Sequence, residues 1–422
     1  MFLPISDELR KKLDELDHFI ETEIKPLQAE NEQFFDHRRE YARTDWENDG
    51  FPRKEWEDLL REMERRADEA GHLRLGLPSE VGGGDASNLD IAVIREHLAA
   101  KGLGLHNDLQ DESSIVGNFP LVFVINRYGT EEQKAAYIEG IIRGHNHVAF
   151  ALSEPDHGSD ATWIETTATR DGDTWTINGM KRWNSQIHRA RHDLVFARTS
   201  GKPGDHKGIT AFFVPVADPG LRIVENAWTF NMPSDHATVA LENVRVPSSA
   251  ILGAEGEGLS MAQSFIQQNR IRQAAASIGA ARYCIEQSVL YAQQRETFGK
   301  PLAERQALQF ELADLFAECE MLRSFVFVTA ARLDNEDPMA VSANVSIANY
   351  RSNRFVCRAA DFAIQIHGGL GYSREKQFEH IYRHHRRYRI TEGSDEIQIR
   401  NVVASLFRRR RPDSSYATEK AG

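Results

Sequence analysis

The hydrophobic period of this 422-residue chain changes twice, and this change constrains the fold more than any other feature. Up to about Gly144, and again after Gly258, apolar residues recur at spacings of three and four, the period of an amphipathic helix. Between these blocks, short β-branched and aromatic runs such as residues 211–216 are separated by turn pairs such as Asn178-Gly179. Strands at this spacing indicate an antiparallel barrel or sandwich, so the predicted order is helices, a small β-domain and helices.

Composition argues against several classes of protein. With 51 Lys and Arg against 63 Asp and Glu, the net charge of −12 argues against nucleic acid as a partner. No stretch approaches the ~20 apolar residues that cross a bilayer, and the N-terminus lacks a signal-peptide pattern, so no membrane partner is expected. The three cysteines lie far apart, and His145 and His147 lack further ligands, so we expect neither disulfides nor a metal site. These features are typical of a cytoplasmic protein with reduced thiols.

Local signals predict where several helices begin and end. Apolar positions within residues 9–24 share one helical stripe, which Pro26 is expected to end. The sequence Thr-Glu-Glu-Gln at 130–133 resembles an N-terminal cap. A long helix is expected over 342–366, stopped by two glycines. The mixed histidines and arginines of 380–389 are predicted to form a basic face for a subunit contact or an anion.

Two candidate ligand-binding segments flank the start of the β-region. Residues 152–160, Leu-Ser-Glu-Pro-Asp-His-Gly-Ser-Asp, could offer hydroxyls and backbone N–H groups to a heterocycle or a phosphate, but an ordinary polar turn has the same composition. In residues 181–186, Trp183 could cover a planar ligand while Ser185 reaches a ring nitrogen. A tryptophan that fills the core of the β-domain would explain the second segment equally well.

Three further segments lie in the C-terminal helical block. Residues 295–301 present an arginine, a threonine and a phenylalanine that could clamp a pyrophosphate and stack on an adenine, or simply end a helix. The glycines within 365–372 allow close backbone approach to a ligand, although helix ends commonly use glycine. In 391–397, Ser394 could cap the last helix, and Glu392 stands on the loop before it. An isolated glutamate is usually a solvated surface group, so its meaning depends on its neighbours.

Together, and in this order, the five segments resemble the acyl-CoA dehydrogenase family, and the resemblance covers nearly the whole chain. It implies an α+β, mainly α fold with an N-terminal helical domain (1–146), a middle β-barrel (147–252) and a C-terminal four-helix bundle (253–422). It also implies FAD as cofactor and a homotetramer, a dimer of dimers.

The resemblance assigns roles by position. Leu152 and Ser153 would meet the pyrimidine side of the flavin, Ser159 the phosphates and the acyl-CoA, Trp183 would cover the ring, and Ser185 would approach N5. From a neighbouring subunit, the ADP half of FAD would be held by Arg295, Thr297, Phe298, Gln306, Gln365, Gly368 and Gly369. Ser394 and Glu396 would lie near the diphosphate or adenosine. The acyl-CoA would be bound by Ser159, Arg270, Glu392 and Gly393.

Glu392 matches the catalytic base of most members of that family. The implied reaction is α,β-dehydrogenation of an acyl-CoA to a trans-2-enoyl-CoA, as in fatty acid β-oxidation, with electrons passed to an electron-transfer flavoprotein. A desolvated carboxylate is a better base near neutral pH, and the backbone N–H of Glu392 would help to polarise the thioester carbonyl. Two other functions remain open: a non-catalytic FAD- or CoA-binding subunit of a heteromeric complex, and a flavin oxidase or monooxygenase.

The stretch Asn-Asp-Leu-Gln-Asp-Glu-Ser-Ser at 107–114 is more polar than a plain fatty-acyl pocket requires. We therefore expect either a short, branched or oxygenated acyl group, or side chains that face solvent.

Overall fold

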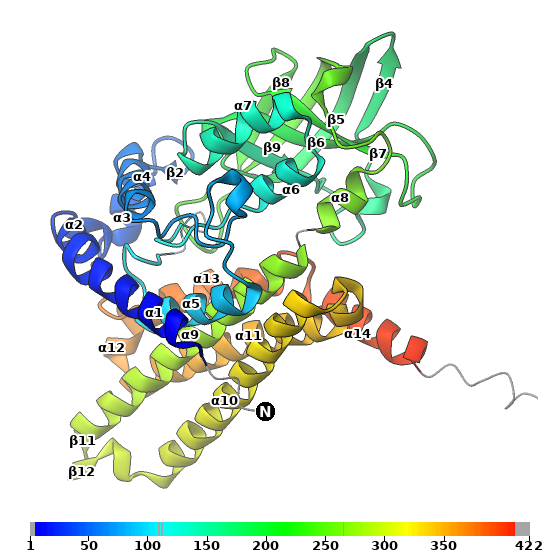
Figure 1. Ribbon diagram of the computed structural model, residues 1–422. Helices are drawn as coiled ribbons and strands as arrows, with labels where there is room; N and C mark the ends of the chain where they lie inside the picture. Colours follow the sequence, from blue (N-terminus) through cyan, green and yellow to red (C-terminus); the bar gives the residue numbers. More distant parts are fainter. Residues whose placement is uncertain (1–4, 109, 111–112, 265, 410–422) are drawn as a thin grey trace, which may run out of the picture.

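A sheet domain lies above a layer of long helices in the computed structural model, which describes residues 5–108, 110, 113–264 and 266–409 (Figure 1). The N-terminal helices lie beside both layers, and the chain crosses from helices to the sheet and back. This arrangement confirms the predicted fold class of a mainly helical protein with a β-domain in the middle.

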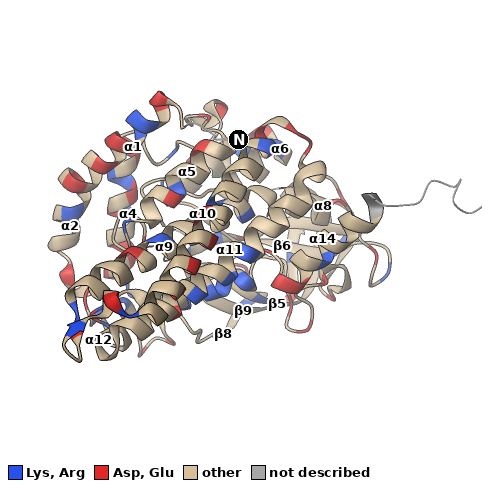
Figure 2. Cartoon of the chain, turned by 90° about the horizontal axis from the view of Figure 1, so that it is seen from below, with Lys and Arg blue, Asp and Glu red and all other residues tan. Residues whose placement is uncertain are grey.

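Short amphipathic helices build the N-terminal region. Thr130 caps the last of them, because its hydroxyl accepts the Gln133 N–H while the Gln133 side chain accepts the Thr130 N–H, which confirms the predicted cap. Oppositely charged pairs lie along the first two helices (Figure 2). The elements are α1 (Asp7–Phe19), α2 (Lys25–Ala29), α3 (Arg39–Arg43), β1 (Thr44–Asp45), β2 (Phe51–Pro52), α4 (Lys54–Glu69), α5 (Asn88–Ala99), α6 (Pro120–Tyr128) and α7 (Glu131–Ile142).

Pro26 does not end the first helix, so that prediction is wrong. A π-helical segment at Ile20–Ile24 follows α1, and Pro26 lies in the first turn of α2. Proline lacks the N–H that would bond four residues back, and a change in helical hydrogen bonding just before it lets the chain continue in the same direction. The apolar stripe therefore stays buried through Leu27.

The middle region forms one eight-stranded sheet of order β10-β7-β6-β4-β5-β9-β8, with β3 joined to β6. Its neighbours are antiparallel except β3 with β6 and the single β4 pairing with β6. Trp175, Phe212 and Val244 centre an apolar cluster of their own. The strands are β3 (His147–Ala151), β4 (Thr167–Asp171), β5 (Thr174–Ser185), β6 (Ala190–Arg198), β7 (Ile209–Pro215), β8 (Leu221–Asn226), β9 (His236–Pro247) and β10 (Ile251–Leu252).

Long helices build the C-terminal region around α9. A Cβ at position 279 of α9 would lie 2.2 Å from the Glu96 carbonyl oxygen, so only glycine lets α5 pack this closely. The predicted stop near residue 368 is confirmed, since α11 ends at His367. The elements are α8 (Gly258–Ser264), α9 (Ile266–Gln294), β11 (Glu296–Thr297), β12 (Lys300–Pro301), α10 (Gln306–Asn335), α11 (Pro338–His367), α12 (Gly369–Tyr372), α13 (Phe378–Arg386) and α14 (Asp395–Arg409).

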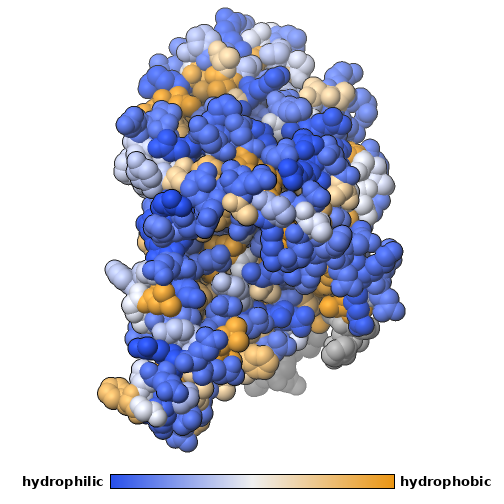
Figure 3. Space-filling model, turned by 90° about the vertical axis from the view of Figure 1, so that its left-hand side faces the viewer, coloured by the Kyte–Doolittle hydropathy of each residue, from blue (hydrophilic) through white to orange (hydrophobic). Residues whose placement is uncertain are grey.

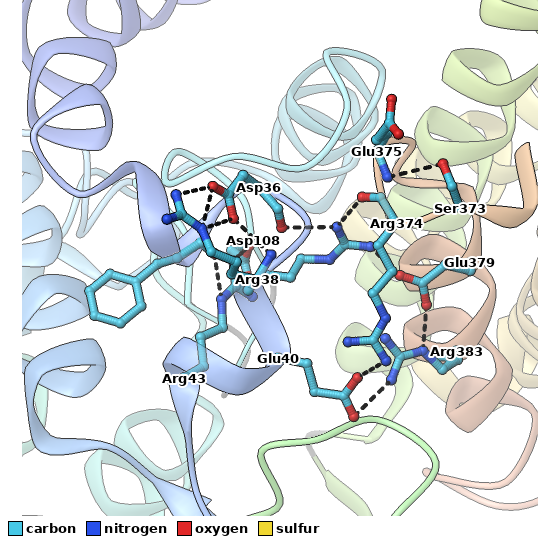
Figure 4. Close-up of polar contacts among 12 residues, drawn as sticks. Asp36, Arg38, Glu40, Arg43, Asp108, Ser373, Arg374, Glu375, Glu379 and Arg383 are labelled. Carbon is cyan, nitrogen blue, oxygen red and sulfur yellow. Dashed lines mark hydrogen bonds and ion pairs between the residues drawn. The ribbon is translucent and has the colours of Figure 1, made fainter. Parts of the chain in front are cut away.

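An ion-pair network joins α3 to α13 (Figure 4). Arg39 pairs with Glu379, which also accepts from Arg383 at 2.7 Å. Beside it, Arg43 makes two parallel hydrogen bonds of 2.9 Å to the buried Asp108. This two-bond geometry is typical of arginine–carboxylate recognition and fixes α3 within the N-terminal region, whereas the Arg39–Glu379 pair holds that region against the helical layer.

The predicted basic face of α13 is wrong for its histidines. His380, His384 and His385 are all buried. Burial, with the arginines nearby, lowers the pKa of each, to about 3 for His385. They are therefore neutral packing groups at ordinary pH, because burial disfavours the charged form.

Candidate active site

Glu392 lies in a left-handed turn immediately before α14, with φ of 56°. Its carbonyl oxygen accepts hydrogen bonds from Arg270 Nε at 3.0 Å, from Arg270 Nη2 at 2.6 Å and from Gln398 Nε2 at 3.1 Å. A left-handed conformation costs about 1–2 kcal/mol for a residue with a Cβ, so it persists only where surrounding contacts impose it. Here α9 and α14 impose it from both sides.

The Glu392 carboxylate points to the start of α9, where Asn269 Nδ2 donates to its Oε1 at 2.7 Å. Burial lowers the pKa of the neighbouring Arg270 to about 10, and the charge of Glu392 offsets part of this. Arg270 therefore remains a cation at neutral pH. The structure thus brings together Arg270 and Glu392, both of which the resemblance assigns to acyl-CoA binding, and adds Asn269, which the sequence analysis did not single out.

A second group of predicted residues meets where β3 ends beside β5. The Leu152 carbonyl accepts from Lys181 Nζ at 3.2 Å, and the Ser153 carbonyl accepts from the Arg182 N–H at 3.0 Å. Lys181 is buried and pairs with Glu154 at 2.9 Å. Burial lowers the pKa of Lys181 to about 8, against the raising effect of Glu154. This buried pair, which sequence reasoning missed, fixes the backbone of the Leu152–Ser153 loop.

Trp183 and Ser185 follow directly on β5. Trp183 has φ of 68° and a half-exposed indole, with the Arg182 guanidinium 4.9 Å from its ring centroid. It is therefore not the core tryptophan of the sheet, a role that Trp175 fills. Ser185 Oγ lies 2.8 Å from His236 Nδ1 on β9. A strained backbone that presents an aromatic face to the surface is typical of a ligand site.

The third predicted group lies at the far end of α9. Arg295 and Thr297 lie on the β11–β12 hairpin with Phe298, which is 98% exposed and has φ of 51°. At 1.5 Å per residue, α9 carries this hairpin about 40 Å from Asn269. Figure 1 shows it at the opposite end of the helical layer from the sheet.

Gln365, Gly368 and Gly369 share that far end, because the His367 ring stacks on Tyr291 of α9 at 4.2 Å. A Cβ on Gly368 or Gly369 would meet nothing within 4 Å, so open space surrounds this loop. Ser394 and Glu396 instead flank the start of α14 beside Glu392. One chain therefore holds two separate groups of predicted cofactor-binding residues. Gln306 lies with the far group at the start of α10, and Ser159 lies exposed on the loop after β3.

The polar stretch at 107–114 does not face solvent where it is described; Leu109, Asp111 and Glu112 lie outside the described residues. Asp108 pairs with Arg43, Gln110 donates to the Pro233 carbonyl, Ser113 donates to Glu64, and Ser114 donates to the His106 carbonyl. Internal contacts therefore account for the polarity of Asp108, Ser113 and Ser114, whereas the side chain of Asn107 is buried and neither its Nδ2 nor its Oδ1 makes a hydrogen bond within the described residues.

No group of three or more His, Cys, Asp or Glu side chains suited to a metal ion occurs in the described part of the chain. Across the same residues, we find no helix with the length and hydropathy to cross a membrane.

Comparisons with known proteins place this geometry in a family. Residues 6–145 match the acyl-CoA dehydrogenase N-terminal domain, 149–244 the middle domain and 256–407 the C-terminal domain. Human mitochondrial short-chain specific acyl-CoA dehydrogenase is 33% identical over 339 residues, which cover 80% of each chain. Subunit CarC of the caffeyl-CoA reductase–Etf complex of Acetobacterium woodii is 30% identical over 340 residues, 80% of this chain and 88% of that one.

A solved glutaryl-CoA dehydrogenase from Mycobacterium smegmatis, in complex with FADH2, superposes with a TM-score of 0.76 at 26% identity and covers 95% of each chain. The family domains and these relatives thus indicate an oxidoreductase that acts on acyl-CoA thioesters. The chain belongs to the acyl-CoA dehydrogenase family.

Proposed function

We propose that this protein catalyses the FAD-dependent α,β-dehydrogenation of an acyl-CoA to a trans-2-enoyl-CoA, with Glu392 as the base. The observation that carries the proposal is the fixed turn at Glu392, whose carboxylate is aimed by Asn269 while Arg270 holds its carbonyl. A carboxylate held in a strained, defined position suits removal of one particular α-proton.

The residues present fit a flavin dinucleotide. A half-exposed Trp183 offers a face for a ring, the hydroxyls of Ser153 and Ser185 offer hydrogen bonds, and the open space at Gly368 allows close approach of a ligand. Leu152, Ser153, Trp183 and Ser185 would hold the flavin end, with Ser159, Ser394 and Glu396 toward the phosphates. When bound there, FAD would supply the redox chemistry of the reaction, as the acceptor of the β-hydrogen and its electron pair.

We propose that the ADP end of the cofactor is held by a second copy of the chain. Within one chain, the β11–β12 hairpin that carries Thr297 lies at the opposite end of the helical layer from the sheet that carries Trp183 (Figure 1). Exposed apolar side chains, among them Phe310, Phe316 and Met321 on α10, support an oligomer. Figure 3 shows separate apolar patches, including some at the lower end where the hairpin lies. We propose that the oligomer is a homotetramer, a dimer of dimers, and that each chain has domains at 1–146, 147–252 and 253–422.

In the reaction, Glu392 receives the α-proton of the thioester, and the ionised carboxylate becomes a carboxylic acid. Its backbone N–H would polarise the thioester carbonyl, and Arg270 and Gly393 would help to place the acyl-CoA. We propose an electron-transfer flavoprotein as the electron acceptor, a partner class that the Etf-complex relative supports.

The test is anaerobic mixing of the holoenzyme with a panel of acyl-CoAs while flavin absorbance is recorded. We expect at least one thioester to bleach the flavin. The reduced flavin should then be reoxidised slowly by air and rapidly by an electron-transfer flavoprotein. Rapid reoxidation in air would favour an oxidase, and no bleaching with any thioester would favour a non-catalytic subunit. Glu392→Gln should keep FAD and acyl-CoA binding and lose the reduction rate by about 10²–10⁴-fold, the usual range for a general base. A near-normal rate in this variant would remove Glu392 from the role of base.

A further inference from the structure

Three hydrogen bonds connect Glu392 to the cation of Arg272 through two amide side chains. Arg272 Nη1 donates to Asn118 Oδ1 at 2.6 Å, Asn118 Nδ2 donates to Asn269 Oδ1 at 3.2 Å, and Asn269 Nδ2 donates to Glu392 Oε1 at 2.7 Å. The four residues come from three segments: α9 carries Arg272 and Asn269, the loop before α6 carries Asn118, and the turn before α14 carries Glu392.

The direction of this chain of hydrogen bonds is fixed by its two ends. A guanidinium can only donate, and an ionised carboxylate can only accept. Asn118 must therefore turn its Oδ1 to Arg272. This orientation points the Nδ2 of Asn118 to Asn269. Asn269 in turn must point its own NH₂ to Glu392. A flip of either amide would bring two donors or two acceptors together, which leaves buried polar groups unsatisfied.

Arg272 has the properties needed to hold the far end. It makes no ion pair with any described carboxylate, and its guanidinium lies 5.5 Å from the centroid of the Phe123 ring. Burial and the nearby charge of Arg95 lower the pKa of Arg272 to about 9, so it is still a cation at neutral pH. Because Asn269 and Arg272 are three residues apart on α9, they share one helix face that Asn118 can bridge.

We propose that Arg272, Asn118 and Asn269 form a directional relay that keeps Glu392 ionised and oriented, with Asn269 as its positioning residue. The proposal rests on the proposed role of Glu392 as base. Hydrogen bonds in series polarise one another, and a bond donated to a carboxylate favours its charged form. Charged groups around Glu392 include Arg270 at its carbonyl, Arg272 and Arg95 behind the amides, and Asp395 on α14, which Arg354 and Arg389 hold.

The first experiment measures the anaerobic flavin-reduction rate of the holoenzyme against pH. Asn269→Leu removes the donor, so the acidic limb of the profile should move up by about one pH unit, the size expected for a hydrogen bond to a charged group. Asn269→Asp should move it at least as far, because a second carboxylate replaces the donor. Gln267→Leu is the matched control, since that amide on the same helix donates to Ser342 and should leave the profile unchanged.

The second experiment tests whether the effect travels through Asn269. Arg272→Met should move the acidic limb to higher pH by a smaller amount than Asn269→Leu does. Arg272→Lys should leave the limb close to its wild-type position, because a cation that can donate remains. In the Asn269→Leu background, Arg272→Met should have no further effect. The relay would be overturned if Arg272→Met shifted the acidic limb equally in the wild-type and Asn269→Leu proteins. It would also be overturned if Asn269→Leu alone left the limb unchanged.

A third measurement separates the relay from the proposed function. The carboxylate infrared band that disappears in Glu392→Gln can be titrated in the holoenzyme without substrate, and its midpoint should rise in Asn269→Leu. If Glu392→Gln still reduces flavin but the midpoint moves, Glu392 is not the base and the relay stands. If the midpoint does not move, the relay is wrong whatever the activity of Glu392→Gln.

Discussion

Lys181 gives the sharpest test of how the sheet domain supports the candidate cofactor site. Its side chain is fully buried, that of Glu154 is 4% exposed, and their charged atoms lie 2.9 Å apart. Lys181→Met leaves the Glu154 carboxylate buried with only the N–H groups of Glu165 and Thr166, at 2.6 and 2.9 Å. Removing one partner of a buried ion pair costs about 3–5 kcal/mol. Because two N–H donors to Glu154 remain, the free energy of unfolding should fall by an amount near the lower end of this range, about 3 kcal/mol.

The assay is urea unfolding of the holoprotein followed by tryptophan fluorescence, to which the buried Trp175 of the sheet contributes. FAD affinity should fall as well, because Lys181 also holds the Leu152 carbonyl. The double variant Glu154→Gln/Lys181→Met should recover more than half of the lost stability, since it leaves no unpaired charge. Lys207→Met is the control, because Lys207 forms only an exposed pair, at 3.8 Å, and should change stability by less than about 1 kcal/mol. A double variant as unstable as Lys181→Met alone would refute this account.

Two further predictions concern stability. Burial lowers the pKa of His106 to about 4 and of His385 to about 3, below the value of about 6.5 of an unfolded chain. Below pH 6.5 the unfolded state therefore binds protons that the folded state does not, and stability should fall by about 1.4 kcal/mol per pH unit for each histidine until their folded pKa values are reached. Urea midpoints between pH 7 and 4.5 check this, and a smaller slope in His385→Gln would identify the group. Thr130→Ala should cost about 1 kcal/mol by loss of the capping box, measured in the same way, whereas an unchanged midpoint would contradict the role of that cap.

Much of the fold could be predicted because its signals are local. The change in hydrophobic period located the sheet, and the Thr130 cap and the glycine after α11 marked real helix ends. The course of the chain at Pro26 could not be predicted, because a π-helical segment is set by packing and has no sequence signature. The histidines of α13 were misjudged for a related reason, since a mixed basic segment does not reveal which of its faces another domain will cover.

Some residues of the candidate site could likewise be predicted from the sequence, and others could not. Glu392 and Arg270 could be assigned through the family resemblance, and the structure places them in contact. Asn118 and Asn269 could not, because they lie 151 residues apart and neither has a motif of its own. Only the packing of α9 against the loop before α6 makes them neighbours.

The length of α9 has a consequence for how the protein would be handled. Because α9 carries the β11–β12 hairpin about 40 Å from Asn269, the proposed binding of the ADP end by a second copy would make cofactor retention depend on mass action between chains. Loading would then vary with enzyme concentration: dilution should strip the yellow colour, and added FAD should drive reassembly.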